Sequence, residues 1–334
     1  MAATQIVYCD DEEPGITRRK MRHGWGYFDP AGNRIIDRDE IDRLNAIGLP
    51  PAYRNAWFCP HRNGHIQAIG WDEKGRKQYR YHPEFRAARE DEKYNLCAAF
   101  GRALPKLRAK VEADLATRAH TKEKTIAAIV RLLDTEHLRI GNETYAKTNK
   151  SFGVTTLRDR HANIRGSTLR LQYKAKSGKL RTLTINDGSL ARFVKRCQDL
   201  PGQKLFQYVD ADGQPRPVTS SDVNEYIRNA MGGDFTAKHF RTWGASAIAF
   251  ETLAHAKRDI SLKALLEPVT ERLGNTPAIA RKSYVHPALI ALIKEGQQAF
   301  RAALNLPRSM RYLSRAERGL IAFLETGQQP AEAA

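Results

Sequence analysis

Residues 139–161 read RIGNETYAKTNKSFGVTTLRDRH, and at this stretch the chain changes from a helical to a strand-like pattern. Upstream of it, apolar residues recur with the spacing of a helix over residues 122–137. Downstream of it, within residues 154–186, apolar and basic side chains alternate over residues 169–174, which is the period of a strand. Residues 175–178, AKSG, then supply a turn, so we expect a basic β-hairpin inserted into a helical domain.

Helical periodicity continues on both sides of this hairpin, from about residue 84 onward. We expect further helices at residues 84–103, 107–117, 188–198, 220–231, 238–256, 261–273, 277–284, 288–304 and 313–326. The first 90 residues instead read as short strands and turns, with one helix that begins near Asp37 and stops before Pro50 and Pro51. Two of the strand-like runs lie at residues 65–72 and 77–82.

The expected fold class is therefore α+β. A small N-terminal β-rich domain, residues 1–90, precedes a larger and mainly α-helical domain, residues 91–327, that carries the inserted hairpin. Residues 328–334 read as a loose tail.

The charge of the chain is strongly uneven. Of its 334 residues 41% are hydrophobic and 28% are charged, and the formal net charge is +18. Residues 1–90 hold 15 basic and 13 acidic side chains, so +16 of this charge belongs to the rest of the chain. Residues 131–185 alone hold 12 basic and 4 acidic side chains. A strip of this sign and density indicates a polyanionic partner, and nucleic acid is the first candidate.

Several kinds of site and location are not supported. No apolar run approaches the roughly 20 residues of a membrane span, and the first 15 residues are acidic, unlike a signal peptide, so we expect a cytoplasmic protein without a membrane partner. The stretch 70–77, GWDEKGRK, ends in Arg and Lys where a phosphate-binding loop needs Lys and then Ser or Thr. Cys59, His61 and His65 lack a fourth ligand, and no carboxylate cluster suggests paired Mg²⁺ ions. We therefore expect no metal and no cofactor.

Five dispersed residues remain as candidates for chemistry. Arg139 lies in the opening stretch, Lys176 in the hairpin turn, and Arg241 in KHFRTWGAS, residues 238–246; Asn275 and Tyr284 lie in GNTPAIARKSYVHP, residues 274–287. In this order and context they resemble the type IB DNA topoisomerases, in particular the small bacterial and poxvirus-like branch. The segment GHIQAIGWDEKGRKQYRYH, residues 64–82, resembles the N-terminal DNA-clamping domain of that family, so the resemblance runs from about residue 15 to residue 312.

The resemblance implies a transesterification in which Tyr284 attacks a DNA phosphodiester. Guanidinium groups suit the developing charge because they are always charged and can bridge two phosphate oxygens, which assigns Arg139 and Arg241. Asn275 can donate an amide N–H to the same oxygens. Lys176 is the candidate general acid, because it has a proton to transfer to the leaving 5′ oxygen.

By the same resemblance, further residues are expected near the DNA. Gln78, Tyr79 and Tyr81 of the N-terminal domain would contact duplex DNA, as would Tyr145 and Lys238 of the larger one. Lys238 would also lie close to the path of the proton. The family relaxes supercoils through a 3′-phosphotyrosyl intermediate without ATP or metal. The expected protein is thus a monomer that clamps around DNA, in the cytoplasm with the nucleoid.

Two other readings stay open. Tyrosine recombinases share the Arg, Lys, Arg and Tyr chemistry, but they usually show His-x-x-Arg at the second arginine, whereas here His239 lies two residues before Arg241. Asn275 also stands nine residues before the tyrosine, where a recombinase has histidine. A basic nucleic-acid-binding protein without catalysis would explain the charge and leave the five residues to chance.

Overall fold

The computed structural model describes residues 5–326, so the tail expected at residues 328–334 lies outside the described residues. The chain divides into two units between Glu92 and Lys93. The long helix α2, Pro83–Ala116, runs through this division. No helix within residues 5–326 is long and apolar enough to cross a membrane.

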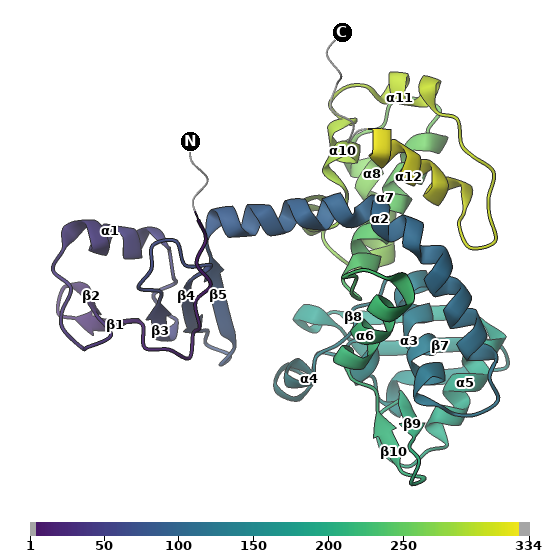
Figure 1. The fold of residues 1–334 in the computed structure, drawn as a ribbon, viewed down its shortest axis with the longest axis horizontal. Coiled ribbons are helices and arrows are strands. Elements are labelled where there is room, and N and C mark those ends of the chain that lie inside the picture. Colours follow the sequence, from purple (N-terminus) through teal and green to yellow (C-terminus); the bar gives the residue numbers. More distant parts are fainter. Residues whose placement is uncertain (1–4, 327–334) are drawn as a thin grey trace. The chain divides into compact units, whose positions relative to one another are not determined.

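The first unit is built on a five-stranded antiparallel sheet in the order β2-β1-β3-β4-β5 (Figure 1). Its strands are β1 Ile16–Met21, β2 Gly24–Phe28, β3 Arg54–Phe58, β4 Ile66–Trp71 and β5 Lys77–Tyr81. Helix α1, Arg38–Ala46, begins at Asp37, whose side chain accepts a hydrogen bond from the backbone of Asp39. Leu44 of α1 packs with Phe58 and the other apolar side chains of the sheet in a small core. The strand-like runs at residues 65–72 and 77–82 are thereby confirmed.

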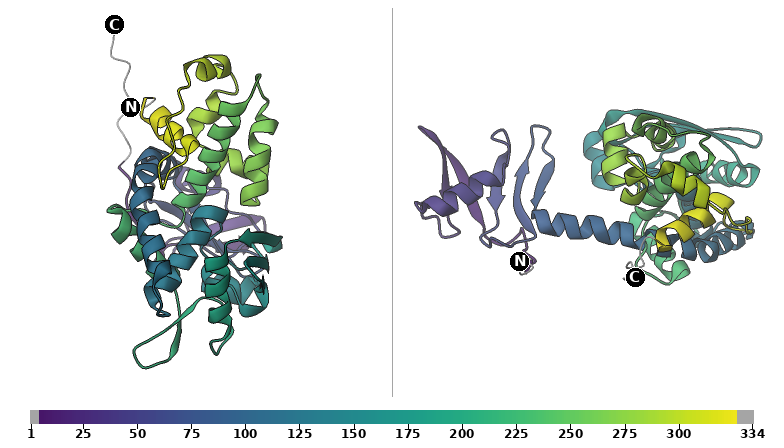
Figure 2. Two further views of the ribbon diagram at one scale, coloured as in Figure 1. Left: turned by 90° about the vertical axis from the view of Figure 1, so that its right-hand side faces the viewer. Right: turned by 90° about the horizontal axis from the view of Figure 1, so that it is seen from above.

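The second unit is mainly helical and has its own, larger core. Besides α2, its helices are α3 Lys122–Glu136, α4 Glu143–Asn149, α5 Gly188–Gln198, α6 Ser220–Met231, α7 His239–His255, α8 Leu262–Leu273, α9 Pro277–Ser283, α10 Pro287–Ala291, α11 Gln297–Ala303 and α12 Arg315–Thr326. Helix α7 lies in the middle, against α3, α8, α10, α11 and α12 (Figures 1 and 2). Its Phe240, Trp243 and Phe250 are fully buried, so the burial of α7 fixes the position of Arg241 on the same helix.

Two small antiparallel sheets interrupt the helices. One has the order β6-β7-β8, with β6 Ala162–Arg165, β7 Thr168–Lys174 and β8 Leu180–Asn186. The other pairs β9 Gln207–Val209 with β10 Pro215–Pro217. The expected hairpin is therefore confirmed as β7–β8, β6 adds a third strand to it, and the α+β class holds.

Two expected helix boundaries are wrong. Residues 84–117 do not break near Pro105 but form one helix, because Leu104, Leu107 and Val111 continue a buried apolar stripe across the proline. That packing offsets the loss of about 3 kcal/mol that an interior proline costs an exposed helix. Conversely, the single helix expected at 288–304 is two, α10 and α11, because the chain turns at Gly296 with a φ of 95°.

Candidate active site

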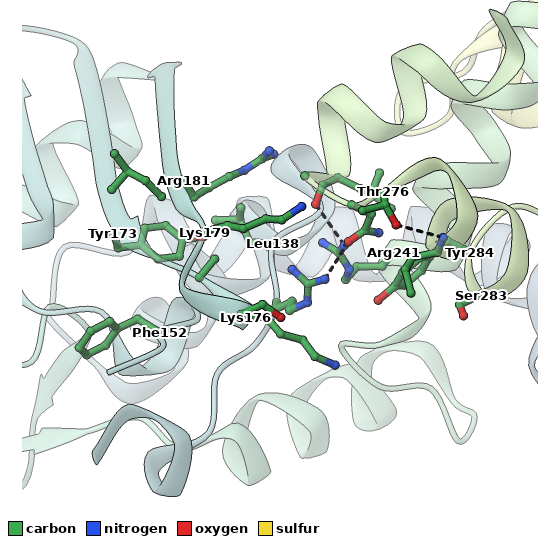
Figure 3. Close-up of a pocket in the computed structure, with 18 residues that line it drawn as sticks. Leu138, Phe152, Tyr173, Lys176, Lys179, Arg181, Arg241, Thr276, Ser283 and Tyr284 are labelled. Carbon is green, nitrogen blue, oxygen red and sulfur yellow. Dashed lines mark hydrogen bonds between the residues drawn. The ribbon is translucent and has the colours of Figure 1, made fainter. Parts of the chain in front are cut away.

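All five residues singled out for chemistry line one pocket of about 540 Å³ in the second unit. They come from five separate places: the α3–α4 connection, the β7–β8 turn, helix α7, the α8–α9 connection and the end of α9. Figure 3 shows the hairpin residues on one side of this pocket and Thr276, Ser283 and Tyr284 on the other. The fold thus brings together side chains that lie as much as 145 positions apart, from Arg139 to Tyr284.

Tyr284 lies at the point where helix α9 ends. Its backbone N–H donates to Ala280, its φ and ψ of −131° and −47° are no longer helical, and Pro287 opens the next helix three residues later. Ser246 of the buried helix α7 donates to the Tyr284 carbonyl at 3.4 Å and accepts from the His286 backbone at 3.0 Å. The backbone of this tyrosine is therefore tied to the core while its side chain faces the pocket.

The surroundings of the Tyr284 phenol favour its ionised form. The guanidinium carbon of Arg241 lies 4.8 Å from the centre of the ring. Burial acts to raise the pKa of the phenol, but the positive charges of Arg241, Arg139 and Lys176 outweigh it. The pKa of Tyr284 is consequently below its usual value, as a nucleophilic tyrosine requires.

Arg241 is almost completely buried, with 5% of its surface exposed. Its guanidinium donates to the carbonyl oxygens of His137 and Leu273 and to Oδ1 of Asn275, the last at 3.1 Å. Burial and then the charge of Arg139 lower the pKa of Arg241 to about 10, so the group stays charged at neutral pH. Because three acceptors hold it, the charge has a fixed position.

Arg139 lies beyond helix α3, not in its last turn, because the left-handed residue His137 ends that helix. The opening stretch folds back on itself here: the backbone N–H of Val154 donates to the carbonyl of Arg139 at 2.9 Å. Gly153 makes this closure possible, since a Cβ atom there would lie 2.6 Å from the same carbonyl oxygen and 2.5 Å from the nitrogen of Gly141. The glycines therefore fix the backbone that carries Arg139.

Asn275 joins the two arginines. Its Oδ1 accepts from Nη2 of Arg139 at 2.7 Å and from Nη2 of Arg241 at 3.1 Å. Since Oδ1 accepts both bonds, the amide nitrogen is the remaining donor, and it has no hydrogen-bond partner among the described residues. The three side chains thus offer a compact set of N–H donors to an anion.

Lys176 stands on the opposite wall, in the turn at residues 176–178 between β7 and β8. The turn is closed by the Ala175 N–H donating to Lys179 at 2.8 Å, and Ser177 and Gly178 both adopt positive φ. Lys176 is exposed, and its charge is one of those that lower the pKa of Tyr284. It can therefore approach a group bound in the pocket from the side away from α9.

The five residues assigned to DNA contact do not line this pocket. Tyr145 is 53% exposed on α4, and Lys238 is exposed at the start of α7. Gln78, Tyr79 and Tyr81 lie on β5 of the other unit. The rings of Tyr79 and Tyr81 stack with centres 5.9 Å apart, so both lie on one face of the strand. Their contact with DNA stays a prediction.

Sequence reasoning missed two residues that shape the pocket. Arg181 of β8 lines it and donates to carbonyls at the end of α8. His137 supplies a backbone carbonyl to Arg241. Neither could be found from the sequence, because a basic residue in a basic hairpin and a backbone oxygen carry no local pattern.

The chemistry of the lining suits a phosphate group. Among the described lining residues there is no Asp or Glu, whereas five side chains are Lys or Arg. Within residues 5–326 no three His, Cys, Asp or Glu side chains are placed to hold a metal ion, and Cys59 instead lies with its sulfur 3.0 Å from that of Cys9. A cationic pocket with a phenol of lowered pKa can bind a phosphodiester and attack its phosphorus.

Comparisons with known proteins give the same direction. The chain matches the family models described as eukaryotic DNA topoisomerase I, catalytic core, over residues 82–293, and bacterial DNA topoisomerase IB, N-terminal domain, over residues 24–72. It is 32% identical to DNA topoisomerase 1B of Acanthamoeba polyphaga mimivirus over 300 residues, which are 86% of this chain and 89% of that protein.

Two more distant similarities complete the comparison. DNA topoisomerase 1 of Mycosarcoma maydis is 26% identical over 70% of this chain, which spans only 24% of that protein. The solved structure of XerH site-specific recombinase in a post-cleavage complex with palindromic difH substrate aligns with a TM-score of 0.38 and 13% identity, over 60% of this chain and 51% of that one. The matched family models and the mimivirus relative establish that this chain belongs to the type IB DNA topoisomerases.

Proposed function

We propose that the protein relaxes supercoiled duplex DNA by cutting one strand with Tyr284, allowing that strand to rotate, and resealing it. The observation that carries this proposal is the convergence of Tyr284, Arg139, Arg241, Asn275 and Lys176 on one pocket that has no carboxylate among its described lining residues. Membership of the family indicates that the substrate is DNA. The position of each of the five residues in the pocket supports the role that we propose for it.

Charge stabilisation falls to the arginines and Asn275. A diester bound against Arg139 and Arg241 would have its non-bridging oxygens within reach of two fixed guanidinium groups and of the Asn275 amide nitrogen, which has no other partner in the described chain. Such preorganised donors are each worth about 3–4 kcal/mol at the transition state, because they need not reorganise as charge develops.

The nucleophile needs that help. Ionising a tyrosine of ordinary pKa at pH 7 costs about 4 kcal/mol. The cations around Tyr284 lower its pKa and reduce this cost. In the cleavage step the Tyr284 phenolate oxygen, after release of its proton to water, bonds to phosphorus as the bond from phosphorus to the 5′ oxygen breaks. Lys176 donates a proton to the departing 5′ oxygen, and we place Lys238 near that proton path.

The intermediate is a 3′-phosphotyrosyl ester with a free 5′-hydroxyl, so the energy of the diester bond is preserved for resealing. No ATP or metal is then needed for the two steps. We further propose that one chain acts as a monomeric clamp on duplex DNA, in the cytoplasm close to the nucleoid. The residues in contact with the DNA would be Gln78, Tyr79, Tyr81, Tyr145 and Lys238.

Supercoiled plasmid incubated in EDTA without nucleotide tests this proposal. We expect a ladder of relaxed topoisomers from the parent and none from Tyr284→Phe, which should still bind DNA but form no covalent adduct trapped by detergent. Exchange of strands at a defined site would make the protein a recombinase instead. A mobility shift without relaxation would reduce it to a DNA-binding protein.

The role of Lys176 has a more specific test. Lys176→Ala should slow single-turnover cleavage by about 10²–10⁴-fold, the usual contribution of a general acid. Replacing the bridging 5′ oxygen with sulfur gives a leaving group that needs no proton, so this variant should then cleave almost as fast as the parent. Arg139→Ala, which loses charge stabilisation, should stay slow on the sulfur-substituted strand.

A further inference from the structure

The C-terminal end of helix α8 has all of its last four carbonyl groups occupied. The Gly274 N–H donates to Thr270 at 2.8 Å, as is usual where a glycine ends a helix. The other three carbonyls, those of residues 271–273, accept from arginine side chains. Arg241 of α7 takes the last of them, and Arg181 of the β7–β8 hairpin takes the other two. This end of α8 therefore joins three elements of the pocket.

Of the two arginines that donate to the end of α8, Arg181 is the one that belongs to the same hairpin as Lys176. Its Nη1 donates to Glu271 at 3.2 Å, and its Nη2 donates to Arg272. A guanidinium suits this position because the helix end concentrates negative partial charge on carbonyls that point the same way. Asn275, whose Oδ1 accepts hydrogen bonds from Arg139 and Arg241, is the residue directly after Gly274.

The close packing at this contact also depends on Gly274. Its φ is 68°, and a Cβ atom at this residue would lie 2.7 Å from Nη1 of Arg181. By contrast, residues 176–180 of the hairpin turn are all exposed. The turn itself thus has no buried side chain to hold it in place. Arg181 is the next residue along the chain, and its side chain is half-buried and held by the α8 carbonyls.

We propose that Arg181 is a positioning residue that seats the β7–β8 hairpin on the end of α8 and so sets where Lys176 meets the leaving 5′ oxygen. The inference rests on the proposed role of Lys176 as the general acid. Arg181 acts by holding the hairpin in place, because its guanidinium donates to the α8 carbonyls and not to the phosphate. The hydrogen-bond donors to the phosphate are Arg139, Arg241 and Asn275. A displacement of about 1 Å at a reacting group can cost on the order of 10²-fold in rate.

Single-turnover cleavage of oxygen- and sulfur-bridged strands tests this role. Arg181→Met keeps an unbranched side chain, although a shorter one, and removes the hydrogen-bond donors. We expect it to slow cleavage of the oxygen substrate by about 10- to 100-fold, as misplacement does, and to cleave the sulfur substrate nearly as fast as the parent. The double variant with Lys176→Ala should be no slower than Lys176→Ala alone, because both act on one proton transfer.

The controls separate this role from others. Arg192→Ala removes an exposed arginine of α5 and should leave the cleavage rate unchanged. If Arg181→Met stays slow with sulfur, as Arg139→Ala should, Arg181 is a phosphate contact and the proposal is wrong. If Arg181→Met cleaves both substrates normally and only melts at a lower temperature, Arg181 has a structural role alone and the proposal is again wrong.

A measurement without DNA keeps the two assignments apart. Hydrogen exchange of the peptide that covers residues 174–181 should be several-fold faster in Arg181→Met than in the parent, with Arg192→Ala unchanged. If sulfur fails to rescue Lys176→Ala, the general-acid assignment fails, and faster exchange would still establish that Arg181 seats the hairpin. Unchanged hydrogen exchange in Arg181→Met would show that Arg181 does not hold the hairpin in place, and the proposal would be wrong.

Discussion

At the scale of single residues, Asn275 explains how two like charges can stand side by side in the pocket. Arg139 and Arg241 both donate to its Oδ1, so one amide oxygen offsets part of their repulsion without neutralising either. A carboxylate in this place would pair with the guanidinium groups and compete with the phosphate. The amide therefore keeps both charges available, and both act to lower the pKa of Tyr284.

The lowered pKa of Tyr284 gives the first prediction. In a spectrophotometric titration near 295 nm, the difference between the parent and Tyr284→Phe isolates this one phenol from the other 11 tyrosines of the chain. We expect its transition below that of a free tyrosine amide measured alongside, because the surrounding cations favour the phenolate. A transition at or above the reference value would mean that burial outweighs the cations and that the phenol needs a separate base.

The geometry of Arg139 gives the second prediction. Arg139→Lys should be nearly as inactive in single-turnover cleavage as Arg139→Ala, because an ammonium group cannot both donate to Asn275 and span two phosphate oxygens as a guanidinium does. Binding of uncleaved DNA should fall much less than the rate. Full activity of the lysine variant would show that only the charge at residue 139 matters.

At the scale of elements, a partly buried ion-pair network joins α2, α3 and α12. Arg108 donates to both carboxylate oxygens of Asp134 at 2.7 and 2.9 Å and to both of Glu317 at 2.7 and 3.0 Å. Glu317 also accepts from the indole of Trp243 on α7 at 3.2 Å. Trp243 and Arg241 lie two residues apart on α7, so the network contacts the helix that carries Arg241.

Removing the arginine of this network gives the third prediction. Arg108→Met should lower the free energy of unfolding by about 3–5 kcal/mol near pH 7, because two carboxylates with side chains only 10% and 14% exposed lose their partner. Burial acts to raise the pKa of Glu317, but Arg108 outweighs it and holds the pKa below its usual value, so this stability is lost as the pH falls through that lowered pKa. Denaturant titrations should therefore show parent and variant converging in acid.

The matched control is Arg311→Ala, which breaks an exposed ion pair with Glu112 and should leave stability unchanged. If Arg311→Ala lowered the free energy of unfolding as much as Arg108→Met, the effect of removing either arginine would not depend on its burial. An Arg108→Met deficit that does not shrink in acid would place the effect in the packing of the side chain and not in its charge.

The elements also show what a sequence can predict here. Periodicity identified α3, α5–α9 and the β7–β8 hairpin, because each has an unbroken apolar face of its own. Periodicity wrongly predicted a helix break at Pro105, because packing of the apolar side chains overrides the proline. It also missed the helix break at Gly296, because the conformation of a single glycine depends on its neighbours. The five pocket residues were predicted from motifs, whereas the seat of Arg181 exists only once α8 and the hairpin have met.

At the scale of the whole molecule, the charge distribution sets how the protein meets DNA. Residues 91–334 carry a net charge of +16, and the pocket within them is lined by five Lys or Arg side chains. Binding of such a surface to DNA releases counterions, so its affinity depends on salt. If about six phosphates are contacted, affinity should fall on the order of 10³-fold between 50 and 200 mM salt. A flat response would mean that this charge does not face DNA.

The slope of that salt dependence can also sort the proposed DNA contacts by mechanism. Lys238→Ala should reduce the slope of log affinity against log salt by about one, because it removes one phosphate-neutralising charge. Tyr79→Ala should weaken binding by a similar amount at every salt concentration and leave the slope unchanged, since an exposed aromatic ring releases no counterions. Binding of the Tyr284→Phe protein, measured over a salt series with each added substitution, gives both slopes without interference from cleavage. If Tyr79→Ala changed the slope, or Lys238→Ala did not, the contacts assigned to β5 and to the start of α7 would have to be exchanged or abandoned.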